Sequence, residues 1–362
     1  MMVSVLSAEL VGESLVQWHS CMISGDLQSA KELKSDVEAL VKQMEPDDKM
    51  LAYYQLIDFR FQLLRNRHEQ GASVDEDSLY DVCVEIDDYL RFMYYYVSGQ
   101  AEFMHGRYKS AIRTYKIAER LIEKVNDSAE KAEFYQKLGI SYYRIDQYTF
   151  AFSYMEQALE FFEKHDTYRL NEITCKQVLA AINTELRRYD EAERLYDEIL
   201  KASIPFPYTY ALNLYNMGAN RIMLTRFDEA IRYFKEALTY EAFATSPLAL
   251  KAEYYLTHLY MRTGQYKGGL EELEAKAIQH QSKEIVAKCF ICRGLYLTDD
   301  ILLIQQGLRK LESEENYFDC QELGEEIANY FKQQNKFETA LLFSEYALEM
   351  SRKRIILGVD QT

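Results

Sequence analysis

A short pattern recurs about every 40 residues along this chain: an aromatic residue, followed three positions later by a small one. Its six copies are Tyr108-x-x-Ala111, Tyr148-x-x-Ala151, Tyr189-x-x-Ala192, Phe227-x-x-Ala230, Tyr266-x-x-Gly269 and Phe337-x-x-Ala340. The small residues are spaced by 40, 41, 38, 39 and 71 positions, and the last gap has room for one divergent copy around 285–318. A period of this length predicts a solenoid of stacked helical repeats.

Further small residues recur at fixed offsets from each copy. The position 12 before the small residue is Gly or Ala in five of the six copies, and the position 7 after it is Ala in four. Residues at such offsets share one face of a helix. We therefore expect two antiparallel helices per copy, which approach at the small residues while Tyr115, Tyr196 and Phe234 fill the gaps. This alternation is typical of the tetratricopeptide repeat (TPR), so we predict an all-α chain with a right-handed superhelical solenoid of about seven repeats.

The residues before the repeats follow a different pattern. Apolar periodicity predicts helices over 9–24, 27–43 and 49–67, with breaks at Gly25-Asp26 and at 45–48. We expect three domain-level segments: a three-helix bundle over 1–67, a polar linker over 68–78, and a TPR-like repeat domain over 79–362. A linker of this kind would let the bundle swing against the solenoid.

Composition excludes several classes of function. A net charge of −16 argues against nucleic-acid binding, which needs a basic face. No run of about 18 apolar residues and no signal peptide is seen, so we predict a cytoplasmic protein without membrane contact. Six scattered cysteines, including Cys289-x-x-Cys292, suit reduced core positions better than a metal set, and we predict neither metal nor cofactor. His258 is interpreted as a packing histidine, although an inner helix would also bring it near a ligand.

Several motifs resemble those of one known family. They are Val16-Gln17-Trp18-His19, Met44-Glu45-x-Asp47, Tyr53-Tyr54-Gln55-Leu56-x-x-Phe59-Arg60, Lys131-Ala132-Glu133-Phe134, Ser141-Tyr142-Tyr143, Leu214-Tyr215-Asn216-Met217-Gly218 and Leu256-Thr257-His258-Leu259-Tyr260. In order and spacing the chain resembles, over essentially its whole length, the Rap family of response-regulator aspartate phosphatases and related regulators.

The resemblance implies a quorum-sensing regulator with two partners. The bundle would bind a response regulator, and the solenoid groove would bind a signalling peptide of five or six residues. Peptide binding would compact the solenoid, draw the bundle onto it and release the regulator. Two alternatives stay open: an active phosphatase that hydrolyses the aspartyl phosphate of the regulator, and a generic TPR scaffold without a peptide switch.

The resemblance also assigns a catalytic position, which this chain occupies differently. Phosphatase members carry a glutamine at the turn before the third helix, where its amide orients water against the aspartyl phosphate. Alignment without a gap places Asp48 there. A carboxylate accepts hydrogen bonds but donates none, and it repels a phosphoryl group, so phosphatase activity is doubted.

Other site residues follow from the same alignment. Asp47, Asp48 and Phe59 would contact the regulator; the alternatives are that Asp47 and Asp48 cap the third helix and that Phe59 belongs to the bundle core. Asn216 would bind the peptide backbone, because an amide donates and accepts at once. Glu185 would pair with a cationic peptide residue, and Tyr143, Tyr215 and Thr257 would line the groove, with packing between repeats as the alternative for these three.

Overall fold

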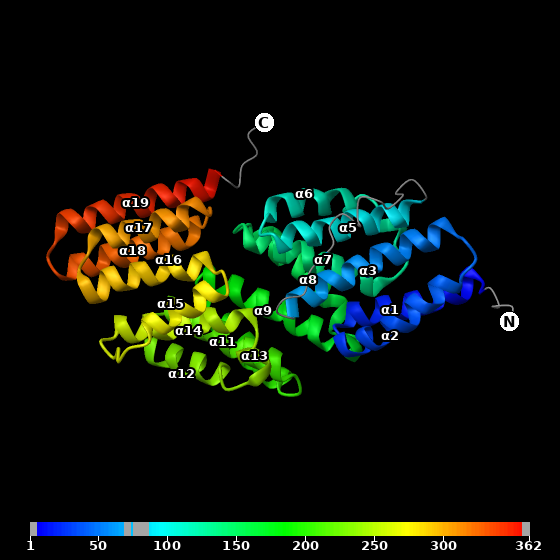
Figure 1. Ribbon diagram of the computed structural model, residues 1–362, viewed down its shortest axis with the longest axis horizontal. Helices are drawn as coiled ribbons and strands as arrows, with labels where there is room; N and C mark the ends of the chain where they lie inside the picture. Colours follow the sequence, from blue (N-terminus) through cyan, green and yellow to red (C-terminus); the bar gives the residue numbers. More distant parts are fainter. Residues whose placement is uncertain (1–5, 69–73, 75–86, 357–362) are drawn as a thin grey trace. The chain divides into compact units, whose positions relative to one another are not determined.

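The computed structural model describes residues 6–68, 74 and 87–356, and these residues are overwhelmingly helical (Figure 1). Besides the helices they contain one isolated parallel bridge, between Leu6 and Met44. The prediction of an all-α chain is confirmed. Two compact units make up the chain, Met1–Asn213 and Leu214–Thr362, and each is described by itself.

The first unit begins with the three predicted helices. They are α1 (Ala8–Ser24), α2 (Leu27–Gln43) and α3 (Asp48–His68). Gly25 ends α1 in the left-handed conformation, with a φ of 78°, where glycine avoids the strain that a side chain would add. Asp26 then caps α2 by accepting a 3.0 Å hydrogen bond from the Ser29 backbone N–H. The predicted linker lies almost entirely outside the described residues.

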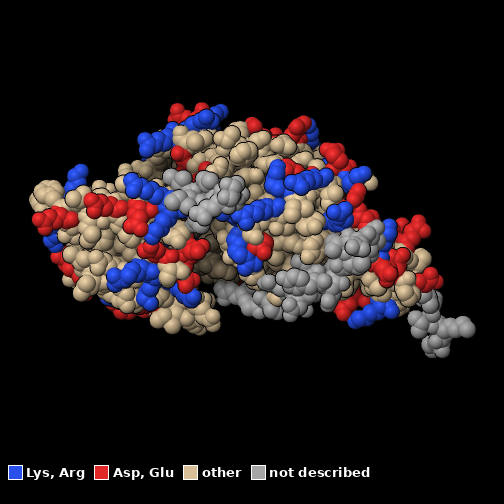
Figure 2. Space-filling view, turned by 90° about the horizontal axis from the view of Figure 1, so that it is seen from above, with Lys and Arg blue, Asp and Glu red and all other residues tan. Residues whose placement is uncertain are grey.

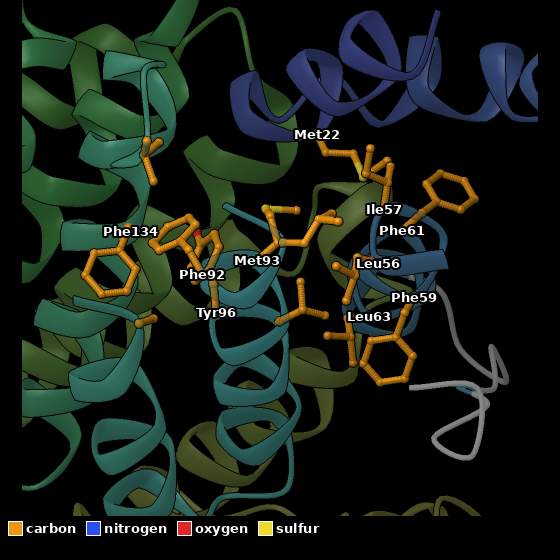
Figure 3. Packing of buried hydrophobic residues seen from close by; sticks show 14 of the residues in the cluster. Met22, Leu56, Ile57, Phe59, Phe61, Leu63, Phe92, Met93, Tyr96 and Phe134 are labelled. Atoms are coloured by element: carbon orange, nitrogen blue, oxygen red, sulfur yellow. The ribbon is translucent and has the colours of Figure 1, made fainter. Parts of the chain in front are cut away.

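Six repeat helices complete this unit. They are α5 (Asp88–Met104), α6 (Tyr108–Glu119), α7 (Ser128–Arg144), α8 (Tyr148–Phe162), α9 (Arg169–Glu185) and α10 (Tyr189–Ser203), with short 3₁₀ turns at Ile122–Lys124 and Asp166–Tyr168. The bundle packs directly on them, α3 against α5 and α1 against α7 and α9. Leu56, Phe92 and Phe134 lie in one continuous hydrophobic core that joins bundle and repeats (Figure 3). Trp18 belongs to the same core.

The second unit continues the helix pairs. Its helices are α12 (Phe227–Ala237), α13 (Glu241–Ala244), α14 (Pro247–Arg262), α15 (Leu270–Gln279), α16 (Lys283–Cys292), α17 (Ile301–Ser313), α18 (Tyr317–Gln333) and α19 (Phe337–Ile356), with a π-helical turn at Arg293–Thr298. Helix α11 (Pro207–Met223) spans the boundary between the units. The divergent copy expected around 285–318 is the pair α16 and α17. Counting α5/α6 through α18/α19, the described residues contain the seven predicted pairs.

The recurring aromatic residue marks the start of the second helix in a pair. Five of the six begin a helix: Tyr108, Tyr148, Tyr189, Phe227 and Phe337. Two positions earlier, a residue with positive φ ends the first helix in every copy; these residues are Gly106, Asp146, Arg187, Thr225, Gly264 and Asn335. The left-handed residue closes each first helix by the hydrogen-bond pattern of a Schellman motif.

The fifth copy departs from this register. Gly269, expected on the helix seam, precedes α15 instead, with a φ of 107°. The Tyr266 hydroxyl accepts a 3.0 Å hydrogen bond from the Leu270 backbone N–H, so the aromatic residue stays outside the helix and holds its start. Lys276, one of the two residues other than alanine found seven positions after the small residue, pairs with Glu253 of α14 at 3.0 Å.

The small residues on the first helices allow close packing, as predicted. A Cβ on Gly99 would lie 2.4 Å from a ring carbon of Tyr115, and one on Gly218 would lie 2.9 Å from the Phe234 ring. Both rings are buried. Each large side chain therefore fills the space that the glycine opposite leaves open.

Candidate functional site

The turn between α2 and α3 holds the two acidic residues aligned with the family's catalytic position. Asp47 caps α3, because its Oδ1 accepts a 2.8 Å hydrogen bond from the Met50 backbone N–H. Asp48 is the first residue of α3 and is exposed. Its carboxylate makes no hydrogen bond or ion pair with the described part of the chain, so the cap belongs to Asp47 alone. Asp48 therefore presents an acceptor to solvent at the positive end of a helix.

Backbone hydrogen bonds from the segment before α1 hold this turn in place. Leu6 donates a 3.0 Å backbone hydrogen bond to Gln43 and accepts one of 3.0 Å from Glu45. The segment before α1 thereby fixes the chain immediately before Asp47 and Asp48.

Phe59, by contrast, is buried in the hydrophobic core that joins the bundle and the repeats. Figure 3 shows it beside Leu63, on the same helix. In this conformation Phe59 offers no surface, so contact with a regulator would require α3 to repack.

A cluster of charged side chains is buried where the bundle meets the repeats. Arg60 of α3 donates to Glu133 of α7 and to the His19 ring of α1. A guanidinium only donates, so His19 Nε2 accepts and the ring is neutral. Its other nitrogen, Nδ1, lies 3.3 Å from the Tyr53 hydroxyl. Arg60, Glu133 and His19 are all buried. We call these residues, together with Glu130, the bundle cluster.

Glu130 is the second buried carboxylate of α7, one turn before Glu133. The Tyr89 hydroxyl donates to its Oε2 at 3.1 Å, and its Oε1 has no hydrogen bond with the described residues. Burial raises the pKa of Glu130 to about 8, against an opposing effect of the Arg60 charge. Burial, followed by the charge of Arg60, holds the pKa of His19 well below its usual value. At neutral pH the cluster thus contains one ion pair, Arg60–Glu133, a neutral histidine and a protonated Glu130.

Sequence reasoning did not assign a role to this cluster. Three of its residues, His19, Arg60 and Glu133, stand inside motifs that carried the family resemblance, next to Trp18, Phe59 and Phe134. The sequence does contain one signal for this cluster: its charged residues stand at positions that the helical period predicts to be buried.

Two of the predicted peptide-site residues, Tyr143 and Glu185, belong to the first unit. The Tyr143 ring is half-buried on α7, with its centroid 6.0 Å from that of Tyr148. Burial, followed by the negative charge of Glu185, raises the pKa of Tyr143 above its usual value. Glu185 is the last residue of α9 and is half-buried.

The other three predicted residues lie in the second unit. The Tyr215 ring packs between repeats, with centroids 5.6, 5.8 and 6.1 Å from those of Phe234, Phe243 and Tyr255. The neighbouring Asn216 differs, because its half-buried amide makes no hydrogen bond with the described residues. Thr257 donates a 3.0 Å bond to the Glu253 carbonyl within α14.

His258 is satisfied within the second unit. Its ring stacks on Tyr254 at 5.5 Å, and Nε2 lies 2.6 Å from the Glu326 carboxylate, which also accepts from Arg262 and Tyr296. The charges of His258 and Arg262 outweigh burial and hold the pKa of Glu326 at about 2. The packing interpretation of His258 agrees with this geometry. Cys289 and Cys292 are both buried in α16.

Surface charge and helix polarity are consistent with the composition. Lys and Arg side chains are intermixed with Asp and Glu over the face shown in Figure 2. Among the described helices, none is long and apolar enough to cross a membrane. No group of three or more His, Cys, Asp or Glu side chains within the described ranges is placed to hold a metal ion.

Comparison with known proteins identifies two segments. Residues 5–66 match the family model of the N-terminal region of response regulator aspartate phosphatase H. Residues 169–240 match a tetratricopeptide repeat model. The first match covers the three-helix bundle, including Asp47, Asp48 and Arg60, and the second lies within the repeats.

Whole-chain relatives extend these matches. A Rhodococcus hoagii protein called type II methyltransferase M.CeqI is 40% identical over 99% of this chain and 71% of its own length. Response regulator aspartate phosphatase E of Bacillus subtilis is 27% identical over 94% of each chain. The crystal structure of a Rap protein complexed with competence and sporulation factor superposes with a TM-score of 0.89 and 26% identity, covering 97% of this chain and 99% of that one. The methyltransferase name describes the Rhodococcus protein; over the aligned residues this chain has the fold of the Rap structure.

Proposed function

The chain belongs to the Rap family, and from this we propose that it is a cytoplasmic quorum-sensing regulator that binds a response regulator and releases it when a short peptide occupies its TPR groove. The observation that carries the proposal is the likeness to a Rap–peptide complex over 97% of the chain. Two features support the proposal: Asp48 is exposed at the α2–α3 turn of the bundle, and the half-buried amide of Asn216 in the repeat domain makes no hydrogen bond with the described residues.

We assign the two binding surfaces as follows. The regulator contacts the α2–α3 turn at Asp47 and Asp48, and contacts Phe59 once α3 repacks. The peptide backbone is bound by Asn216, while Glu185 pairs with a cationic side chain. Tyr143, Tyr215 and Thr257 border the groove, and of these Tyr215 also supports the stacking of the repeats.

The Asn216→Ala variant tests the peptide site. We expect it to keep its affinity for the regulator and to need about tenfold more peptide for release, because one amide contributes two hydrogen bonds of roughly 0.5–1.5 kcal/mol each. Size-exclusion chromatography of the chain with each response regulator of its host identifies the complex. A titration with five- and six-residue export peptides then measures its release.

Gln157→Ala serves as the matched control, because Gln157 is an exposed amide on α8 that bonds only within its own helix. Equal release curves for Asn216→Ala and the unaltered chain would refute the peptide assignment. A chain that binds no response regulator and no peptide would instead support the generic scaffold.

A substitution at Asp48 distinguishes a regulator that only binds its partner from a phosphatase. We expect the unaltered chain to leave the decay of a phosphorylated receiver domain at its intrinsic rate, because an exposed carboxylate cannot donate to the phosphoryl group. The Asp48→Gln variant restores the amide, and we expect it to accelerate decay at least tenfold. Accelerated decay with the unaltered chain would establish the phosphatase alternative.

A further inference from the structure

One carboxylate in the second unit accepts hydrogen bonds from side chains of two other repeats. Glu326 of α18 binds His258 of α14 at 2.6 Å and the Tyr296 hydroxyl through its Oε1, and Arg262 of α14 at 2.9 Å through its Oε2. Its pKa of about 2 keeps the carboxylate ionised at neutral pH. An ionised carboxylate only accepts hydrogen bonds, so His258 Nε2 carries a proton and donates.

The bond between His258 and Glu326 passes over an intervening repeat. The two residues are 68 positions apart. They belong to the pairs α14/α15 and α18/α19, and the pair α16/α17 lies between these in the chain (Figure 1). In a repeat array each pair contacts mainly its neighbours, and stability is close to a sum of neighbour terms. A bond from α14 to α18 adds a term that this sum does not contain.

The intervening pair joins the same carboxylate through Tyr296. This residue lies in the π-helical turn Arg293–Thr298, which follows α16. Its ring centroid lies 6.0 Å from that of His258 and 5.4 Å from that of Tyr330 on α18. Single π-helical turns of this kind are frequent at functional sites. The turn therefore contributes a donor to the contact between α14 and α18.

Arg262 extends the contact to the repeat before α14. Its guanidinium carbon lies 4.5 Å from the ring centroid of Phe227, the first residue of α12. A cation near the face of an aromatic ring is attracted to it. Four consecutive pairs, from α11/α12 to α18/α19, thus meet in one set of side-chain contacts.

Burial makes these bonds depend on one another. His258 is buried, and the Glu326 side chain is only 13% exposed. A carboxylate in such a position is costly to leave without its donors. The three donors and Glu326 are therefore expected to stay together or to separate together.

We propose that Glu326, His258, Arg262 and Tyr296 form a clamp that makes the repeats of the second unit open and close as one cooperative block. We call these four residues the Glu326 clamp. They act as positioning residues, because they hold α14, the turn after α16 and α18 in one arrangement. The proposal concerns the free chain and requires neither the regulator nor the peptide.

Amide hydrogen exchange of the full chain, read by mass spectrometry, tests the clamp. Glu326→Gln keeps the shape of the side chain but removes its charge. We expect exchange in both α14 and α18 to become at least tenfold faster and exchange in the first unit to stay unchanged, because exchange reports opening of each cooperative part separately. Glu325→Gln is the matched control: Glu325 is exposed on α18, and its bond among the described residues is to Gln321 of the same helix.

His258→Phe tests whether the block is cooperative. Phenylalanine can keep the stacking on Tyr254, whose ring centroid lies 5.5 Å from that of His258, but it cannot donate to Glu326. We expect exchange in α14 and α18 to rise by the same factor, about tenfold. Faster exchange in α14 alone would mean that the repeats open one by one, and would overturn the proposal.

A double variant separates one shared contact from two independent ones. His258→Phe with Glu326→Gln should exchange no faster than the faster single variant, because both substitutions remove the same bond. Effects that multiply, or unchanged exchange in Glu326→Gln, overturn the clamp. Circular dichroism establishes that each variant is folded. If Glu326→Gln loses helix content, Arg262→Met replaces it in the same comparison, with a smaller rise of about threefold.

Discussion

Replacing Arg60 with alanine is expected to lower the free energy of unfolding of the first unit by about 3–5 kcal/mol, the cost of leaving a buried carboxylate without its cation. Arg60 and Glu133 are both buried, and their ion pair joins α3 of the bundle to α7 of the repeats. Arg60→Ala would therefore weaken the contact between the bundle and the repeats.

The chain contains a natural reporter for this measurement. Trp18 is its one tryptophan; it is fully buried in the shared core and donates a 2.8 Å hydrogen bond to the Ala30 carbonyl. Urea unfolding followed by tryptophan fluorescence thus reports on the unit that contains the bundle.

A double variant distinguishes charge from packing. Arg60→Met together with Glu133→Leu replaces the pair by apolar side chains of similar volume, and should recover most of the lost stability, because well-packed apolar residues replace buried ion pairs at little cost. A double variant no more stable than Arg60→Ala would mean that the shape of the site, not its charge, determines the contact.

The same substitution bears on the switch. The bundle cluster holds α1 and α3 against α7. If release of the regulator depends on this docked state, Arg60→Ala should bind the regulator more tightly and require more peptide for release. The titration described for Asn216 measures both quantities.

The fold was predictable from sequence because its signals are local and repeated. An aromatic residue followed three positions later by a small one recurs in six of the seven pairs, so the copies together establish a register that one copy could not. The prediction was wrong for the Tyr266 copy. There two glycines, Gly268 and Gly269, both adopt positive φ, and the helix begins only at Leu270. The two helix-breaking residues outweigh the pattern around them.

The candidate site was less predictable for a physical reason. Alignment gives the position of Asp48, but not that Asp47 takes the cap and leaves Asp48 exposed. The bundle cluster combines residues from α1, α3 and α7, more than 70 positions apart between Arg60 and Glu133. Contacts at that separation have no period in the sequence, so only the folded chain reveals them.

Glu130 should make the first unit less stable as pH rises from 6.5 to 8. Its pKa of about 8 in the folded chain exceeds the value of 4.5 expected when unfolded. Between these values the folded state holds a proton that the unfolded state has released, so stability falls with rising pH. His19 has the opposite trend, because its lowered pKa costs stability only below its usual 6.5. Below pH 6.5 the effects of Glu130 and His19 on stability oppose each other, and above pH 6.5 only the effect of Glu130 remains.

The release of one proton changes the free energy of unfolding by about 1.4 kcal/mol per pH unit. We therefore expect the first unit to lose on the order of 2 kcal/mol of this free energy between pH 6.5 and 8. Glu130→Gln cannot titrate, and its unfolding midpoint in urea, followed by Trp18 fluorescence, should stay level over this range. Glu326→Gln is the control: the pKa of Glu326 is about 2, so its contribution is lost only as pH falls below 4.5, and this variant should keep the slope. A slope that survives in Glu130→Gln would assign the proton to another group. If the slope disappears, docking of the bundle is coupled to a proton held at the contact between α7 and the bundle helices, and the regulator complex should respond to pH with the opposite sign.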